Sequence, residues 1–173
     1  MILGVVLAGG QSRRFGTDKA LARFAGESLL ERAVAQLQAW CDEVVVVGRE
    51  DAPVAVLPDW PRAGMGPLAG LAGALRHAQE QAFASVLSAP VDCPLLPEDL
   101  LARLSPAPAF LLDQPVIGHW PVAAFAAADA ILMGEGRRSM RRLAESIGAR
   151  AVACEGTLAN VNTPEDLAAL LPR

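Results

Sequence analysis

The chain has 173 residues, of which 53% are hydrophobic and 20% charged, so it can bury the core of one domain and is too apolar to stay disordered. A formal net charge of −4 argues against a nucleic-acid-binding surface over the whole molecule. The three cysteines form no CxxC pair, which disfavours a zinc knuckle or a disulfide framework and favours reduced thiols in a cytoplasmic protein. The sequence contains no apolar run of membrane-spanning length, and we expect no membrane span and no signal peptide.

Strand-like and helix-like segments alternate along the chain. Continuous apolar runs predict buried strands at 4–8, 43–48 and 84–89, with a shorter candidate at 52–57. Apolar residues at helical spacing predict helices at 27–40, 68–82 and 97–104. Beyond Pro106 the pattern predicts strands at 110–112, 115–125 and 149–153, and helices at 137–147 and from Pro164 onward. This alternation predicts one α/β domain with a mainly parallel sheet.

Ligands of open α/β sheets bind beyond the carboxyl ends of the strands, which here selects residues 8–19, 58–67 and 90–94. The first segment belongs to LAGGQSRRFGTDK at 7–19. Its paired glycines allow backbone N–H groups to approach an anion closely, and its cations would suit a polyphosphate: Arg13, Arg14 and Lys19. It contains neither GK[ST] nor GxGxxG, which disfavours an ATPase P-loop and a dinucleotide site. The alternative is a glycine turn followed by a solvated basic loop.

The other two segments each present a carboxylate. Asp92 lies between prolines in Pro90-Val-Asp-Cys-Pro94, directly after a predicted strand, and its oxygens could bind Mg²⁺ together with substrate phosphates. The alternative is that Asp92 caps the next helix. Asp59, in Leu57-Pro-Asp-Trp60, has a comparable position, although by itself it reads more simply as a turn residue.

Four motifs together resemble the molybdenum cofactor guanylyltransferases, a family in the Rossmann-like nucleotidyltransferase group: LAGGQSRRFGTDKA, GPLAGL at 66–71, PVDCP at 90–94 and NVNTPEDL at 160–167. The resemblance extends over residues 2–170. It implies a three-layer fold with helices on both faces of the sheet, a GTP-binding part at about 1–105 and an acceptor part at about 106–173. It also implies transfer of GMP from GTP to the phosphate of molybdenum-loaded molybdopterin, with release of pyrophosphate.

The same resemblance implies roles for individual residues. Backbone groups of the first strand and its loop would hold the guanine nucleotide: Leu7, Ala8, Gly9 and Gly10. Arg14 and Lys19 would contact its phosphates and stabilise the departing pyrophosphate, and Asp59 would lie on the nucleotide side. Asp92 would bind Mg²⁺ associated with GTP, and Asn160 and Asn162 would face the pterin. Val47 departs from the family pattern, because relatives have an asparagine there that contacts the nucleotide.

The resemblance further implies contacts with other molybdenum cofactor proteins or recipient molybdoenzymes, with no nucleic acid and no membrane as partner. Three rival functions stay open: a molybdopterin cytidylyltransferase, another small nucleotidyltransferase, and a non-catalytic GTP-binding regulator. LAGG and GPLAGL favour GTP over CTP, and the presence of Arg14, Lys19 and Asp92 argues against a non-catalytic regulator. The arginine-rich run 136–142 is more simply interpreted as the solvated face of a helix than as a site for the pterin phosphate. His119 is a candidate for the acceptor pocket, weaker than the two asparagines.

Overall fold

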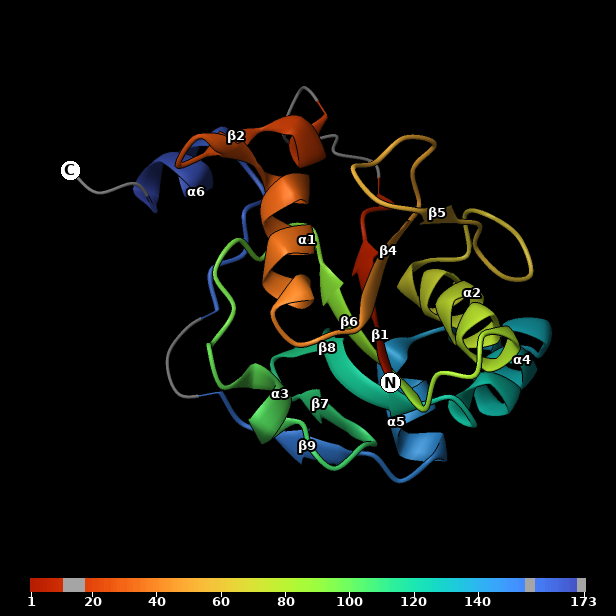
Figure 1. The fold of residues 1–173 in the computed structure, drawn as a ribbon. Helices are drawn as coiled ribbons and strands as arrows, with labels where there is room; N and C mark the ends of the chain where they lie inside the picture. The colour runs from red at the N-terminus through yellow and green to blue at the C-terminus, as the bar shows by residue number, and fades with distance from the viewer. Residues whose placement is uncertain (11–17, 155–157, 171–173) are drawn as a thin grey trace.

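The computed structural model describes residues 1–10, 18–154 and 158–170. Within these ranges a seven-stranded sheet has the order β5-β4-β1-β6-β8-β7-β9 (Figure 1). Its centre consists of three parallel strands, β1 (Ile2–Leu7), β4 (Glu43–Val47) and β6 (Ser85–Pro90). Leu7 is in register with Val47 on one side and Pro90 on the other, so the three carboxyl ends meet at one edge of the sheet.

The outer strands complete a mainly parallel sheet, as the sequence predicts. β5 (Val56–Leu57) extends it beside β4, and β9 (Arg150–Val152) pairs in parallel with β7 (Ala109–Leu111). β8 (Gln114–Pro121) runs antiparallel to both of its neighbours, β6 and β7. A short hairpin of β2 (Arg23–Phe24) and β3 (Glu27–Ser28) forms a separate sheet.

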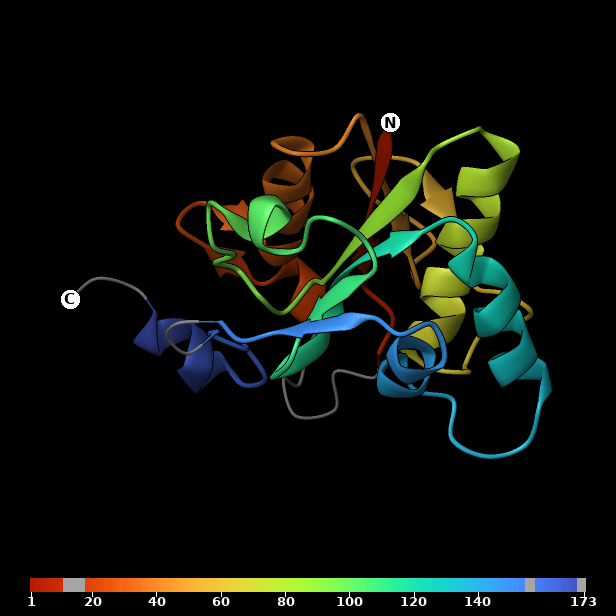
Figure 2. The same cartoon turned by 90° about the horizontal axis from the view of Figure 1, so that it is seen from below.

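Helices cover both faces of the sheet, which confirms the predicted three-layer fold (Figures 1 and 2). One face packs on α1 (Leu29–Gln38) and α3 (Leu100–Arg103). The other packs on α2 (Pro67–Glu80), α4 (Ala124–Met133) and α5 (Met140–Ser146). Successive residues of β1 serve the two cores in turn, because strand side chains alternate between faces: Val5 packs with α2 and Val6 with α1.

Local signals fix several helix starts. Ser28 and Glu31 form a capping box at α1, and Pro67 occupies the first turn of α2. Thr163 caps α6 (Pro164–Ala169), as expected from proline at the first helical position, and Asp166 completes that capping box. A 3₁₀ turn, η1 (Lys19–Leu21), begins at Asp18, whose side chain accepts a hydrogen bond from the Ala20 N–H.

The prediction of a strand at 115–125 is wrong in its second part. β8 ends at Pro121, and Ala124–Met133 forms helix α4, which the sequence reading missed. The segment AFAAADAILM is apolar around almost its whole circumference, so it lacks the polar face that makes a helical period visible. Within the described ranges, no helix is both long enough and apolar enough to cross a membrane.

Candidate active site

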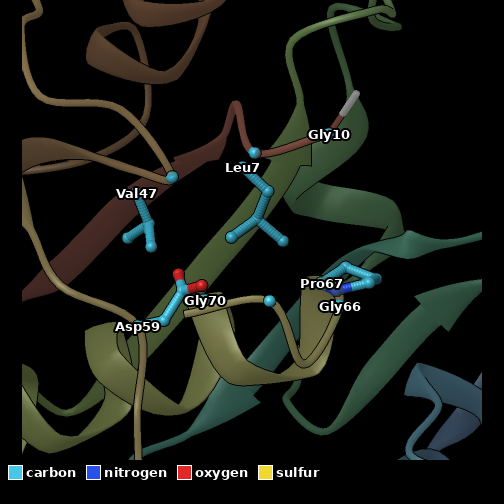
Figure 3. A pocket seen from close by; sticks show the side chains of 10 residues that line it. Leu7, Gly10, Val47, Asp59, Gly66, Pro67 and Gly70 are labelled. Carbon is cyan, nitrogen blue, oxygen red and sulfur yellow. The ribbon is translucent and has the colours of Figure 1, made fainter. Parts of the chain in front are cut away.

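A cavity of about 510 Å³ opens at the carboxyl ends of β1 and β4 (Figure 3). Leu7, Gly9 and Gly10 line it from the β1 side, and Val47 and Gly48 line it from the β4 side. The opposite wall consists of Asp59 and the beginning of α2 with its preceding turn: Gly64, Gly66, Pro67 and Gly70. The fold therefore gathers Leu7, Gly9, Gly10 and Asp59, four of the residues expected to hold a nucleotide, around one cavity.

Backbone forms much of the cavity wall, because its glycines permit close approach. Gly48 has a φ of +87°, and a Cβ there would lie 2.4 Å from both the N and the Cα of Gly9. The Ala8 N–H donates to the Val47 carbonyl at 2.9 Å, which joins the two loops just beyond their strands. A Cβ on Gly70 would lie 2.8 Å from Leu7 Cδ2 and 3.2 Å from Val47 Cγ1, so glycine at this position lets α2 pack closely against β1 and β4. Such a wall offers peptide groups to a ligand with little side-chain obstruction.

Asp59 brings a carboxylate into this cavity of glycine and apolar side chains (Figure 3). The loop after β5 holds the residue in place, since the Trp60 N–H donates to the Ala69 carbonyl in α2 at 3.0 Å. Partial burial raises the pKa of the Asp59 carboxyl, and a hydrogen bond from the Gly64 backbone opposes that rise. A partly desolvated carboxylate is a strong acceptor for a ligand edge that presents N–H donors.

A second cluster lies where β6 ends. Lys19 Nζ donates to Asp92 Oδ2 at 3.1 Å, and the two side chains are only 16% and 23% exposed. The Val91 N–H donates to the Leu7 carbonyl, so this segment continues beside β1. The sequence therefore correctly placed Lys19 and Asp92 at the same edge of the sheet. Arg14 lies outside the described residues.

The donor atoms around Asp92 fit a divalent cation that retains substrate and water ligands. Asp92 Oδ1 is buried and has no hydrogen-bond partner among the described residues. Nowhere in residues 1–10, 18–154 and 158–170 do three His, Cys, Asp or Glu side chains group as a metal site. Mg²⁺ binding through one or two carboxylates and substrate phosphates needs no such group.

Asp18 and Arg49 form an ion pair that sequence reasoning missed. The guanidinium donates to both carboxylate oxygens, Nη1 to Oδ1 at 2.9 Å and Nη2 to Oδ2 at 2.7 Å. This double hydrogen bond lowers the pKa of Asp18, and it raises the pKa of Arg49. Because Asp18 also caps η1, Arg49 steadies the turn that presents Lys19. The two residues are 31 positions apart in the sequence, so no local sequence pattern predicts this ion pair.

The segment before α6 reaches the same region. The Val161 N–H donates to the Asp92 carbonyl at 2.8 Å, which places Asn160 beside the Lys19–Asp92 pair. The Asn160 side chain accepts hydrogen bonds from Cys93 and Gln114. Asn162 is exposed, and its backbone N–H donates to Asp166 as part of the α6 cap. Asn160 therefore lies by the strand-end cluster, whereas the backbone of Asn162 serves the helix start.

Residues 4–152 match the family model described as the MobA-like NTP transferase domain. The chain belongs to this family. It is 37% identical to a molybdenum cofactor guanylyltransferase of Acidiphilium cryptum (strain JF-5), covering 94% of this chain and 90% of the relative. A Rhodobacter capsulatus protein of the same name is 39% identical, with 96% and 93% covered.

Solved structures share the fold of this MobA-like NTP transferase. Molybdopterin-guanine dinucleotide biosynthesis protein A from Archaeoglobus fulgidus superposes with a TM-score of 0.76 over 96% of this chain and 95% of that chain, at 22% identity. The 2-C-methyl-D-erythritol 4-phosphate cytidylyltransferase of Thermus thermophilus gives a TM-score of 0.62 at 20% identity, with 95% of each chain covered. The architecture is thus common to transferases whose names specify different nucleotides.

His119 and the arginine-rich run of this MobA-like NTP transferase form hydrogen bonds within the fold. His119 is buried, with its ring nitrogens near Ser85 Oγ (2.8 Å) and the Leu104 carbonyl (3.3 Å), and burial lowers its pKa. These contacts place His119 in the core and not in an acceptor pocket. In the arginine-rich run, the guanidinium groups of Arg138, Arg141 and Arg142 donate to main-chain carbonyls, so much of their hydrogen-bonding capacity serves the fold.

Proposed function

We propose that this MobA-like NTP transferase transfers GMP from GTP to the phosphate of molybdenum-loaded molybdopterin and releases pyrophosphate. The relatives that support this donor and acceptor are named molybdenum cofactor guanylyltransferases and align over nearly the whole chain. One structural observation carries the proposal: a glycine-walled cavity with a carboxylate lies beside the Lys19–Asp92 pair. A nucleotide lying across both would have its base and its phosphates in chemically suitable surroundings.

Guanine recognition follows from the acceptor chemistry of Asp59. The guanine edge has adjacent N1–H and N2–H donors, which one carboxylate can accept together. Adenine lacks the N1–H donor, and cytosine offers a single exocyclic amine on a smaller ring. Backbone groups of Leu7, Ala8, Gly9 and Gly10 would hold the remainder of the nucleotide, and three of these residues, Leu7, Gly9 and Gly10, line the cavity.

The reaction forms a bond between an acceptor phosphate oxygen and the α-phosphorus of GTP, while the bond to the pyrophosphate oxygen breaks. A phosphate monoester is already ionised at neutral pH, so no general base is needed. The protein contributes positioning and charge stabilisation. Lys19 and Arg14 would stabilise the negative charge of the leaving pyrophosphate. Asp92 would hold Mg²⁺, which when bound withdraws charge from the α-phosphate.

The acceptor would approach from the side of β8 and the segment before α6. In this arrangement residues of about 1–105 handle GTP, and residues of about 106–173, including Asn160 and Asn162, contact the pterin compound. A GTP-dependent biosynthetic step also leads us to expect a cytoplasmic enzyme, which would pass its product to other molybdenum cofactor proteins or to recipient molybdoenzymes.

The test is pyrophosphate release with molybdenum-loaded molybdopterin and GTP, CTP or ATP. We expect GTP to exceed CTP by at least about tenfold in kcat/KM, equivalent to about 1.4 kcal/mol of transition-state binding. Equal use of CTP would contradict guanylyl transfer and favour the cytidylyltransferase alternative. GTP binding without any pyrophosphate release would favour the non-catalytic regulator.

The variant Asp59→Asn tests in the same assay whether Asp59 recognises guanine. The amide keeps the size of the side chain and loses the second acceptor oxygen, so discrimination between GTP and ATP should fall by about tenfold. Glu145→Gln is the matched control, because Glu145 is an exposed carboxylate on α5. Undiminished discrimination in Asp59→Asn would remove Asp59 from guanine recognition.

A further inference from the structure

The side-chain oxygen of Asn160 has two hydrogen-bond donors. Cys93 Sγ donates to Oδ1 at 2.8 Å, and Gln114 Nε2 donates to the same atom at 3.1 Å. The donors come from separate parts of the fold, Cys93 from the loop after β6 and Gln114 from the first residue of β8. Such convergence on one atom fixes the orientation of the carboxamide.

That orientation determines which chemical group of Asn160 faces outward. A carboxamide oxygen has two lone pairs, and both are engaged here. The remaining group is the NH₂, which has no hydrogen-bond partner in the described part of the chain, and Asn160 itself is exposed. Asn160 therefore offers N–H donors to a ligand and no free acceptor.

The thiol of Cys93 is suited to its part in this arrangement. Cys93 is 1% exposed, and its Sγ lies 2.8 Å from Asn160 Oδ1, where the S–H group donates to the carboxamide oxygen. Directly beyond Asn160, the buried Val161 donates its N–H to the Asp92 carbonyl at 2.8 Å. This bond holds the segment that carries the outward NH₂ of Asn160 beside Asp92, the ion-pair partner of Lys19.

We propose that Gln114 and Cys93 are positioning residues that hold Asn160 so that its NH₂ donates to a phosphate oxygen of the acceptor. The proposal rests on the proposed function and deepens it, because it names the acceptor atom that Asn160 contacts. Proximity to Asp92 favours the phosphate over the pterin ring, since the attacking phosphate must reach the α-phosphorus held at Asp92. A fixed donor there would orient the attacking oxygen without adding charge.

Asn160→Asp is the sharpest test. Aspartate keeps an oxygen for the Cys93 and Gln114 donors and replaces the outward NH₂ by a carboxylate oxygen, which repels phosphate. We expect an unchanged melting temperature, an unchanged KM for GTP and a loss of about 100-fold in kcat/KM for molybdopterin. Gln38→Glu is the control, because it introduces the same charge at an exposed position at the end of α1 and should leave transfer unchanged. Wild-type transfer by Asn160→Asp would overturn the proposal.

The positioning role is tested by a conservative pair. Cys93→Ser keeps a donor and should retain activity, whereas Cys93→Ala and Gln114→Met remove one donor each and should raise the KM for molybdopterin by about tenfold while leaving the KM for GTP unchanged. Cys93→Ala that performs as well as Cys93→Ser would show that the thiol only fills space and would overturn its role.

A direct readout separates this proposal from the proposed function. The NMR signals of the Asn160 side-chain NH₂ should shift when inorganic phosphate is added to the wild-type protein, and the shift should diminish in Gln114→Met. This holds even if transfer assays reveal an acceptor other than molybdopterin, in which case only the proposed function fails. Signals that do not respond to phosphate, in a protein that does transfer GMP to molybdopterin, would refute the contact.

Discussion

The two sides of the candidate active site are constructed differently. The cavity on the β1 and β4 side is walled largely by glycine and main chain, with Asp59 as its charged side chain. The region around Asn160 depends on side-chain hydrogen bonds from Cys93 and Gln114. The structure of the first side depends on how closely its backbone segments approach one another. The structure of the second side depends on which polar side-chain atoms form hydrogen bonds. Substitutions should therefore damage the two sides through different mechanisms.

The sheet explains this difference. β4, β1 and β6 are parallel and central, and their in-register ends bring main-chain segments into direct contact. β8 enters antiparallel, so its amino-terminal residue Gln114 lies toward the carboxyl end of β6. The segment before α6 is joined to the Asp92 segment through Val161. Irregular segments of this kind need specific side-chain contacts to be fixed in place.

The largest expected effect lies where the two sides meet. Asp92→Asn removes the charge that would hold Mg²⁺ and pairs with Lys19, so transfer should fall by about 10²–10³-fold, comparable to losing one strong electrostatic contact to a transition state. Pyrophosphate release measures the loss, and a melting curve should change little. Glu98→Gln, an exposed carboxylate further along the same loop, is the control. Equal activity of Asp92→Asn and wild type would remove the metal role.

Gly48→Ala tests the backbone side. The alanine would have a φ near +87° and a Cβ 2.4 Å from Gly9, so we expect a loss of roughly 2–4 kcal/mol in unfolding free energy and weaker GTP binding. Gly26→Ala is matched in φ, at +91°, and has no atom within 4 Å of the new Cβ beyond its chain neighbours. It should lose only about 1–2 kcal/mol, measured by urea unfolding. If the two variants are equally stable, close approach of the loops is not what requires glycine at position 48.

Arg49→Gln should have the smallest effect, a few-fold loss in kcat, because Arg49 acts on Lys19 only through Asp18. Its pH signature is specific. Arg49 holds the pKa of Asp18 below its ordinary value of 3.8, so the pair stabilises the fold above that pH and loses this contribution as pH falls through the lowered pKa. The variant should show a higher Asp18 pKa by NMR titration and less stability lost over that acidic range.

Arg103→Gln is the control for this pair. Arg103 holds the Asp99 carboxylate at 2.7 Å in α3, away from the candidate site, and similarly lowers the pKa of Asp99. It should raise the Asp99 pKa without changing kcat. A kcat loss equal in both variants would mean that Arg49 contributes only general stability.

Much of the fold could be predicted because its signals are local. The buried strands appear as short apolar runs, and Ser28, Pro67 and Thr163 mark helix starts. Helix α4 was missed because its alanine-rich sequence has neither a polar face nor a side-chain cap. The reversed direction of β8 was also beyond local reasoning, since it depends on how β8 pairs with β6 and β7.

The candidate site shows the same division. The motifs identified Asp59, Lys19 and Asp92 because each follows a recognisable strand end, and their neighbourhood follows from parallel pairing. Arg49 and Gln114 have no such signature, because their partners lie 31 and 46 residues away in sequence. What the sequence reading lacked was the pairing of side chains across loops, which exists only after the chain has folded.

The bond between the Val161 N–H and the Asp92 carbonyl joins two segments that are synthesised at different times. Cys93 leaves the ribosome 67 residues before Asn160, an interval of roughly 3–13 s at typical translation rates. Throughout that interval the growing chain already contains the residues that line the glycine-walled cavity, along with Lys19 and Asp92. The candidate active site is therefore completed in a fixed temporal sequence, in which the residues of the glycine-walled cavity are synthesised first and Asn160 last.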